Sequence, residues 1–232
     1  VEIEETESNE AYEYEYDEQA GEGADEGFGY AAIDWDSLPA GEVELHDDIL
    51  DATPEDLDGM DKKAWTDLHR WAAAQVYADA ENEAKFQQYC FELVNGSHSH
   101  PGLDYGQICT ELVNDLMVDE KFDEARKLLP TLGKLNPTDE TLQPRVTACL
   151  DIMTGKHAEG LAVFQAMIDD NDEDPGLLLT VGEDLLSCGR FVEAIEVLEM
   201  AKEVALRHFA DDEELLSEIS DALGFAREVE SQ

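Results

Sequence analysis

A period of about 34 residues in the second half of the chain constrains its fold more than any other sequence feature. Three equivalent positions, Phe122, His157 and Phe191, are spaced by 35 and then 34 residues. Each opens a segment with apolar or small residues at three- and four-residue spacing, as one buried face of an α-helix requires. A single helical hairpin cannot bury its own apolar face, so the constant period predicts stacked neighbouring hairpins.

The hairpin at residues 175–205 shows this pattern most completely. One apolar run predicts a first helix, Gly189 ends it, and a second apolar run predicts its antiparallel partner. Small residues occupy the two positions where the helices must approach closely, Gly182 on the first and Ala194 on the second. The positions that carry the pattern are Leu178, Val181, Gly182, Leu185, Gly189, Phe191, Ala194, Leu198 and Ala201. Together they resemble the tetratricopeptide repeat, a helix–turn–helix unit of about 34 residues.

The resemblance covers roughly residues 103–205 and implies an all-α, TPR-like solenoid of helical hairpins. Apolar periodicity predicts a further helical pair at residues 62–95 and a helix at residues 211–229 that caps the open end of the stack. The expected layout is a helical domain at 62–232 with repeats near 103–137, 140–173 and 175–205. In the first repeat, Pro130 and Gly133 are expected to kink or shorten the second helix.

The charge balance narrows the classes of partner. The chain has 58 acidic and 14 basic residues, a net charge of −44. Phosphate recognition needs clusters of Lys and Arg, so direct binding to nucleic acid or to an anionic membrane is not expected. The excess acid favours a basic protein partner or adaptation to high salt. No apolar run approaches the length of about 20 residues that spans a membrane.

Residues 1–61 are predicted to form an acidic, low-complexity and largely irregular arm. They contain no Lys or Arg, and residues 1–60 hold 22 of the acidic residues. A segment with so much like charge and so few apolar residues should not fold alone. Three hypotheses stay open: the arm binds or masks a partner, it docks on the chain's own helices, or it is a solvated linker. Its candidate anchors are Tyr12, Tyr14, Tyr16, Phe28, Tyr30, Trp35 and Leu38.

No sequence pattern predicts catalysis, a cofactor site or a metal site. The nucleophile-elbow, phosphate-loop, zinc-hydrolase and dinucleotide motifs do not occur. His98 and His100 lie in a loop without a third ligand. The four cysteines, at 90, 109, 149 and 188, lack metal-ligand spacing. They are predicted to be small buried thiols, which fits a reducing cytoplasmic location.

Stacked repeats create a concave surface lined by the first helix of each hairpin, which suits an extended peptide or a partner helix. Helical phase predicts a partner-binding groove formed by Gln107, Thr110, Asn114, Arg145, Ala148, Leu179 and Glu183. Some relatives in the resembled family clamp the carboxylate-terminated tails of heat-shock chaperones with Lys, Arg and Asn. Only Asn114 matches that pattern here, so a basic or apolar segment is the expected ligand.

Three functional hypotheses follow. The first is a non-enzymatic adaptor or dedicated chaperone that holds a basic or extended partner segment through the groove and the arm. The second is an inhibitor or regulatory subunit that mimics nucleic acid or masks a basic enzyme. The third is a repeat scaffold whose acidity reflects a salt-rich environment.

Overall fold

The computed structural model describes residues 38–231, and this part of the chain is entirely helical, without strands. The α-helices are α1 (Ala40–Leu50), α2 (Pro54–Gly59), α3 (Asp67–Asp79), α4 (Glu83–Val94), α5 (Tyr105–Val118), α6 (Phe122–Leu135), α7 (Leu142–Met153), α8 (His157–Asp170), α9 (Pro175–Ser187), α10 (Phe191–His208) and α11 (Glu213–Glu230). A short 3-10 helix, Lys62–Ala64, precedes α3. The all-α fold class is therefore confirmed for the described residues.

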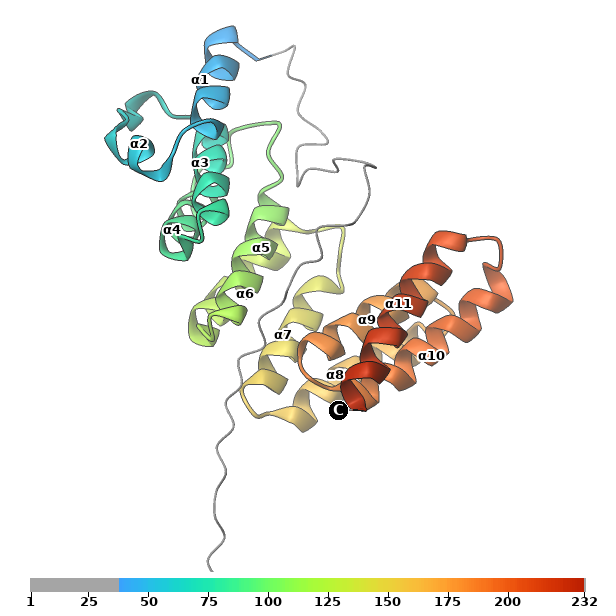
Figure 1. Cartoon of the computed structure of the whole chain (residues 1–232). Helices are drawn as coiled ribbons and strands as arrows, with labels where there is room; N and C mark the ends of the chain where they lie inside the picture. Colours follow the sequence, from blue (N-terminus) through green and yellow to red (C-terminus); the bar gives the residue numbers. More distant parts are fainter. Residues whose placement is uncertain (1–37, 232) are drawn as a thin grey trace, which may run out of the picture.

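Consecutive helices pack as antiparallel pairs, and each pair contacts the next. The pairs are α3 with α4, α5 with α6, α7 with α8 and α9 with α10. Figure 1 shows them following one another in chain order, from α1–α4 at one end to α9–α11 at the other. One apolar core runs through all of them, because each helix buries one stripe against its partner and another against a neighbouring pair.

The turn between the two helices has the same backbone geometry in all four pairs. The second residue after the first helix, directly beyond its C-cap, has a left-handed backbone in every case, with φ of 54° at Glu81, 57° at Glu120, 86° at Gly155 and 69° at Gly189. The N–H of the following residue donates to a carbonyl five positions back, at N···O distances of 2.7 to 2.8 Å. This is the helix-ending Schellman arrangement, which satisfies carbonyls that the helix itself leaves free. Gly189 therefore ends α9 as its sequence position predicts.

Gly182 marks the closest approach of α9 to α10. A Cβ atom at this position would lie 2.5 Å from the Cδ2 atom of Leu198. Its counterpart Ala194 is fully buried. Both small residues thus occupy the places that the sequence pattern assigns to close packing. Any larger side chain at 182 would force Leu198 out of its present position against α9.

The amino-terminal boundary differs from the prediction. The arm was predicted to be largely irregular apart from a short helix or turn at residues 47–61, whereas residues 40–59 form α1 and α2, whose Ile49 and Leu57 are fully buried. Thr66 donates a hydrogen bond to the Glu42 carboxylate at 2.7 Å, and the Nε2 atom of His69 lies 2.9 Å from the Glu42 carbonyl. A few apolar side chains per helix are enough here because α3 supplies the surface that covers them.

The other predicted helices lie close to their expected positions. The pair expected at 62–95 is α3 and α4, and the capping helix is α11, which buries Ile219 and Leu223. Helix α6 is not shortened by Pro130 and Gly133 and runs through both of them to Leu135. Pro130 is exposed, so the carbonyl that loses its intrahelical partner lies on the solvated side of α6.

Candidate partner-binding grooves

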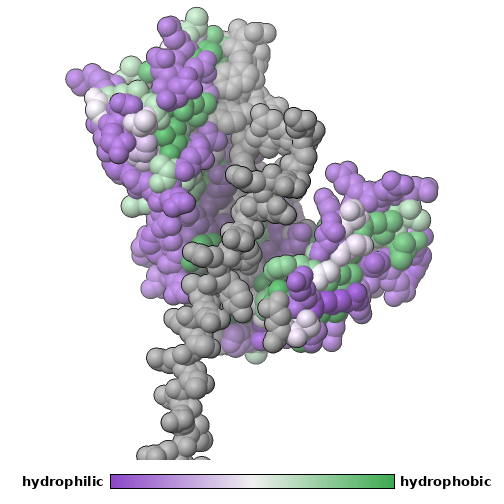
Figure 2. Space-filling model, in the orientation of Figure 1, coloured by the Kyte–Doolittle hydropathy of each residue, from purple (hydrophilic) through white to green (hydrophobic). Residues whose placement is uncertain are grey.

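Two surface depressions combine apolar and acidic residues. Figure 2 shows apolar patches set in a largely hydrophilic surface, both at the α1–α4 end and at the α9–α11 end. At the first end lies the amino-terminal hollow, two adjoining cavities of about 430 and 350 Å³ that share Ala78, Phe86 and Glu111. Its lining is Leu50, Trp71, Gln75, Ala78, Asp79, Glu81, Glu83, Phe86, Glu111, Asn114 and Asp115.

Helices α1, α3, α4 and α5 position this hollow. Trp71 of α3 and Phe86 of α4 are almost completely buried and present only a small apolar floor. Leu50, the last residue of α1, is 41% exposed at the edge of the hollow. Glu111, Asn114 and Asp115 come from α5, where three- and four-residue spacing places them on one face.

The carboxylates of the amino-terminal hollow have no cation of their own. None of the described residues lining the hollow is Lys or Arg, and its five acidic side chains form no ion pair. Burial raises the pKa of Glu111, although a hydrogen bond from Gln107 acts in the opposite direction. Burial also raises the pKa of Asp115, despite a hydrogen bond from Gln87. These carboxylates have lost part of their hydration and form no ion pair, although the Lys121 charge acts on Asp115 from a distance, so an incoming cation would stabilise them.

A polar network fixes the position of the Asp115 carboxylate. Gln87 of α4 donates to both Asp115 and Asp119. Lys121 in turn donates to Gln87 Oε1 at 2.8 Å and to Asp119 Oδ2 at 2.6 Å. The pKa of Asp119 is lowered, first by its hydrogen bond with Lys121. The single lysine of this network therefore neutralises Asp119 and leaves the charge of Asp115 facing the amino-terminal hollow.

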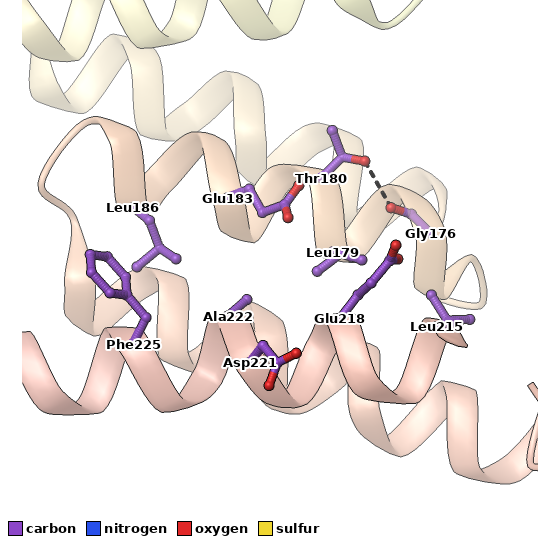
Figure 3. Close-up of a pocket in the computed structure, with 10 residues that line it drawn as sticks. All are labelled: Gly176, Leu179, Thr180, Glu183, Leu186, Leu215, Glu218, Asp221, Ala222 and Phe225. Carbon is purple, nitrogen blue, oxygen red and sulfur yellow. Dashed lines mark hydrogen bonds between the residues drawn. The ribbon is translucent and has the colours of Figure 1, made fainter. Parts of the chain in front are cut away.

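The second depression is the α9–α11 groove, with a volume of about 710 Å³. Figure 3 shows α9 and α11 facing each other across it, with Phe225 beside Leu186 at one end and Glu183 and Glu218 along the middle. Phe225 is 45% exposed. Burial, together with the nearby Asp184 and Glu218 charges, raises the pKa of Glu183. This groove too is lined by apolar and acidic side chains, and no described lining residue is basic.

The seven residues predicted to line one groove do not lie together. Asn114 lines the amino-terminal hollow, whereas Leu179 and Glu183 line the α9–α11 groove. Gln107 is exposed on α5 and donates to Glu111 at 3.1 Å, and Thr110 is half-buried and donates to the Gly106 carbonyl. No single surface therefore contains all of the predicted positions.

The prediction that Arg145 and Ala148 line a binding groove was wrong, because neither side chain is available to a ligand. Ala148 is fully buried, and Arg145 is 9% exposed and donates to the Asp184 carboxylate at 2.8 Å. The cause is that α7 turns this face toward α9, so helical phase alone mistook an inter-pair contact for an open surface. Glu111 and Asp115 were missed, although Glu111 lies one helical turn from the predicted Gln107 and Asn114, and Asp115 directly follows Asn114 in sequence.

Leu38 is the only predicted arm anchor within the described residues. It is half-buried and packs against the helical core, as the hypothesis of docking on the chain's own helices expects for that residue. Tyr12, Tyr14, Tyr16, Phe28, Tyr30 and Trp35 lie outside the described residues.

The loop histidines have packing contacts. The ring of His98 lies 4.7 Å from that of Tyr105, and His100 is buried with its N–H donating to the Tyr105 hydroxyl at 3.0 Å. Across residues 38–231, no three His, Cys, Asp or Glu side chains are grouped so that they could hold a metal ion. Within the same range, every helix is too short or too polar to cross a membrane.

Most of the basic residues are ion-paired within the described part of the chain. All fourteen basic residues lie in the described part of the chain, and ten of them form ion pairs with its carboxylates. The acidic residues outnumber them so strongly that most carboxylates stay unpaired. The surface is therefore negative at both depressions, which disfavours phosphate-bearing ligands.

Comparison with known proteins identifies no relative. No protein-family model matches the chain, and no curated protein sequence matches it.

Proposed function

We propose that this chain is a non-enzymatic interaction module, similar to tetratricopeptide-repeat proteins, that binds a basic and partly apolar segment of a partner protein. Support for the repeat architecture comes from the shared turn at Glu81, Glu120, Gly155 and Gly189 and from the 35- and 34-residue spacing of helix starts at Phe122, His157 and Phe191. A stack of similar hairpins offers surfaces for extended or helical peptides rather than a catalytic site.

The observation that carries the proposal is the composition of the amino-terminal hollow. Its apolar floor suits one aliphatic or aromatic side chain, and its rim carries five carboxylates without a cation. A segment with Lys or Arg on either side of an apolar residue would satisfy both features at once. The apolar contact would supply most of the affinity, and the charges would speed encounter and select the partner.

The arm contributes to this proposal through its charge. Residues 1–37 contain 14 acidic residues and no basic ones. The amino-terminal hollow has the same sign, so the arm is expected to be repelled from it and to leave it open for a ligand. The arm would instead add to the long-range attraction of a basic partner.

The test is a binding titration with a short fluorescein-labelled peptide in which leucines are flanked by lysines. The full chain is compared with the double variant Glu111→Gln/Asp115→Asn, which keeps the side-chain shapes and removes two of the rim charges. The expected loss of affinity is about tenfold, since each partly buried charge pair contributes on the order of 0.5–1 kcal/mol. A matched control is Glu159→Gln/Asp170→Asn on α8, two exposed carboxylates away from both depressions, which should bind as the native chain does.

A second experiment separates the contribution of the amino-terminal hollow from that of the acidic arm. A chain that begins at residue 38 retains α1 and α2, whereas a chain that begins at 62 would lose both helices. The chain that begins at residue 38 should bind the peptide more slowly than the full chain but release it at a similar rate. If Glu111→Gln/Asp115→Asn and the α8 control lose affinity equally, peptide binding depends only on the net charge of the chain. The amino-terminal hollow is then not the binding site.

A further inference from the structure

Two contacts, four residues apart on each helix, join α7 to α9. Arg145 of α7 is ion-paired with Asp184 of α9, and one turn further along Cys149 of α7 meets Cys188, the C-cap residue of α9. Both pairs are separated by 39 residues in sequence. The ion pair and the cysteine pair thus lie one helical turn apart in the same interface between two hairpins.

The thiols are held together by a shared carbonyl. The Asp184 carbonyl oxygen lies 3.9 Å from the Cys149 sulfur and accepts the Cys188 N–H at 3.2 Å. Each thiol also acts on the pKa of the other, which raises that of Cys149 and lowers that of Cys188. Both cysteines are free thiols. Both cysteines therefore lie beside the same carbonyl, at one point of the α7–α9 interface.

The two members of the pair differ in accessibility and acidity. Cys149 is buried, and burial and the hydrogen bond to Cys188 raise the pKa of its thiol. Cys188 is half-buried beside Ser187, and hydrogen bonds from Cys149 and Ser187 lower the pKa of its thiol. Reactivity toward oxidants follows thiolate character and exposure, so Cys188 is the sulfur that reacts first.

The remaining cysteines provide a contrast within the same chain. Cys90 of α4 and Cys109 of α5 are fully buried. Burial raises the pKa of both thiols, that of Cys109 to about 11. They lack both an exposed sulfur and a hydrogen bond that would stabilise a thiolate, so they are expected to stay reduced under conditions that oxidise Cys188.

We propose that Cys149 and Cys188 form a peroxide-reactive dithiol that closes to an intramolecular disulfide. The Cys188 thiolate attacks a hydroperoxide, breaking the O–O bond; the sulfur becomes a sulfenic acid and the second oxygen leaves as an alcohol or as water. The Cys149 sulfur then displaces the hydroxyl of the sulfenic acid, which leaves as water together with the proton of the Cys149 thiol. Two thiols lose two electrons in total, and the peroxide gains them.

The disulfide would replace a hydrogen-bonded contact between two hairpins by a covalent one. It would fix the position of the α7–α8 pair relative to the α9–α10 pair and thereby the setting of the α9–α11 groove. Excess dithiothreitol restores the free thiols by thiol–disulfide exchange. This inference is independent of the proposed peptide ligand, because the amino-terminal hollow lies on other helices.

The experiment treats the full-length chain with one equivalent of hydrogen peroxide and maps the products by mass spectrometry after alkylation and trypsin digestion. Trypsin cleaves after Arg145, Lys156 and Arg190, so the two sulfurs fall on separate peptides, 146–156 and 157–190. We expect these peptides to be joined, with the loss of two hydrogen atoms, and to separate after reduction. Cys90 and Cys109 should be recovered as alkylated thiols only after the chain is unfolded.

Two variants define the order of events. Cys188→Ser changes a half-buried side chain and should abolish the link without loss of helicity by circular dichroism. Cys149→Ser should leave a sulfenic acid on Cys188 that dimedone traps. A link between Cys90 and Cys109, a disulfide between two chains, or over-oxidation of Cys188 without a link would each overturn the proposal.

Discussion

The four hairpin turns allow a quantitative test of the fold, because two of them have glycine at the left-handed position and two have glutamate. Glu120 has a φ of 57°, a conformation that costs a residue with a Cβ about 1–2 kcal/mol. Glycine avoids this cost but loses roughly 0.5–1 kcal/mol more conformational freedom on folding. Removing a negative charge from the carboxyl end of α5 adds about 0.3 kcal/mol or more. The variant Glu120→Gly should therefore be more stable by about 1 kcal/mol.

The assay is thermal and urea unfolding followed by circular dichroism. For a domain of this size, about 1 kcal/mol corresponds to a rise in melting temperature of roughly 2–4 °C. Glu120→Ala is the matched control, because it removes the same charge but keeps a Cβ in the left-handed conformation. It should recover only the small electrostatic part. Conversely, Gly189→Ala should destabilise the chain by about 1 kcal/mol.

Equal stabilisation by Glu120→Gly and Glu120→Ala would refute the reasoning, since the effect would then belong to the charge alone. A loss of stability in Glu120→Gly would refute it more strongly. It would mean that the glutamate side chain makes a contact worth more than the backbone strain, and that the four turns are not equivalent.

Three further predictions concern packing, ion pairing and pH. Gly182→Ala should lower the free energy of unfolding by about 1–3 kcal/mol through a clash with α10, whereas Gly224→Ala, in open space on α11, should raise it by about 0.5–1 kcal/mol in the same urea titration. Arg145→Ala leaves a carboxylate unpaired in the α7–α9 interface and should cost about 3 kcal/mol; Arg207→Ala breaks an exposed pair and should cost less than about 0.5 kcal/mol. The urea midpoint should rise as the pH falls from 7 to about 5, because carboxyls whose pKa is raised by burial, such as Glu111, take up protons in the folded chain first. It should fall again below a pH of about 4, where ion-paired carboxyls of lowered pKa are protonated. A midpoint that declines steadily from pH 7 would contradict this account.

The helices of the second half were predictable from sequence because their signals are local. Apolar residues at three- and four-residue spacing fix a helix, and Gly189 or a small residue such as Gly182 fixes where it ends or what it packs on. Helix α10 accordingly begins at Phe191, as its position in the period predicts. The amino-terminal helices were harder to predict because their burial depends on a distant partner. Neither Ile49 nor Leu57 stands out within an acidic segment until α3 supplies a surface for it.

The candidate site was less predictable than the fold. The apolar stripe of a helix in a stack faces its own partner and both adjoining hairpins, so its phase does not say which side is left open. Arg145 shows the consequence. Helical phase places it among the predicted ligand-binding residues, yet its guanidinium donates to the Asp184 carboxylate. Glu111 gave no signal of its own, because one carboxylate among so many becomes distinctive only when burial and the absence of a cation are known.

The pairing of most lysines and arginines within the fold also affects the interaction between protein molecules in solution. With ten of fourteen cations neutralised within the fold, the outer surface behaves as a polyanion of a single sign. Two copies therefore repel at most orientations, and the osmotic second virial coefficient should be strongly positive at low ionic strength. Added salt shortens the range of this repulsion to about 10 Å at 0.1 M. Concentrated, salt-poor solutions of the protein should thus stay clear, and multivalent cations or mild acid should be the conditions that bring the molecules together.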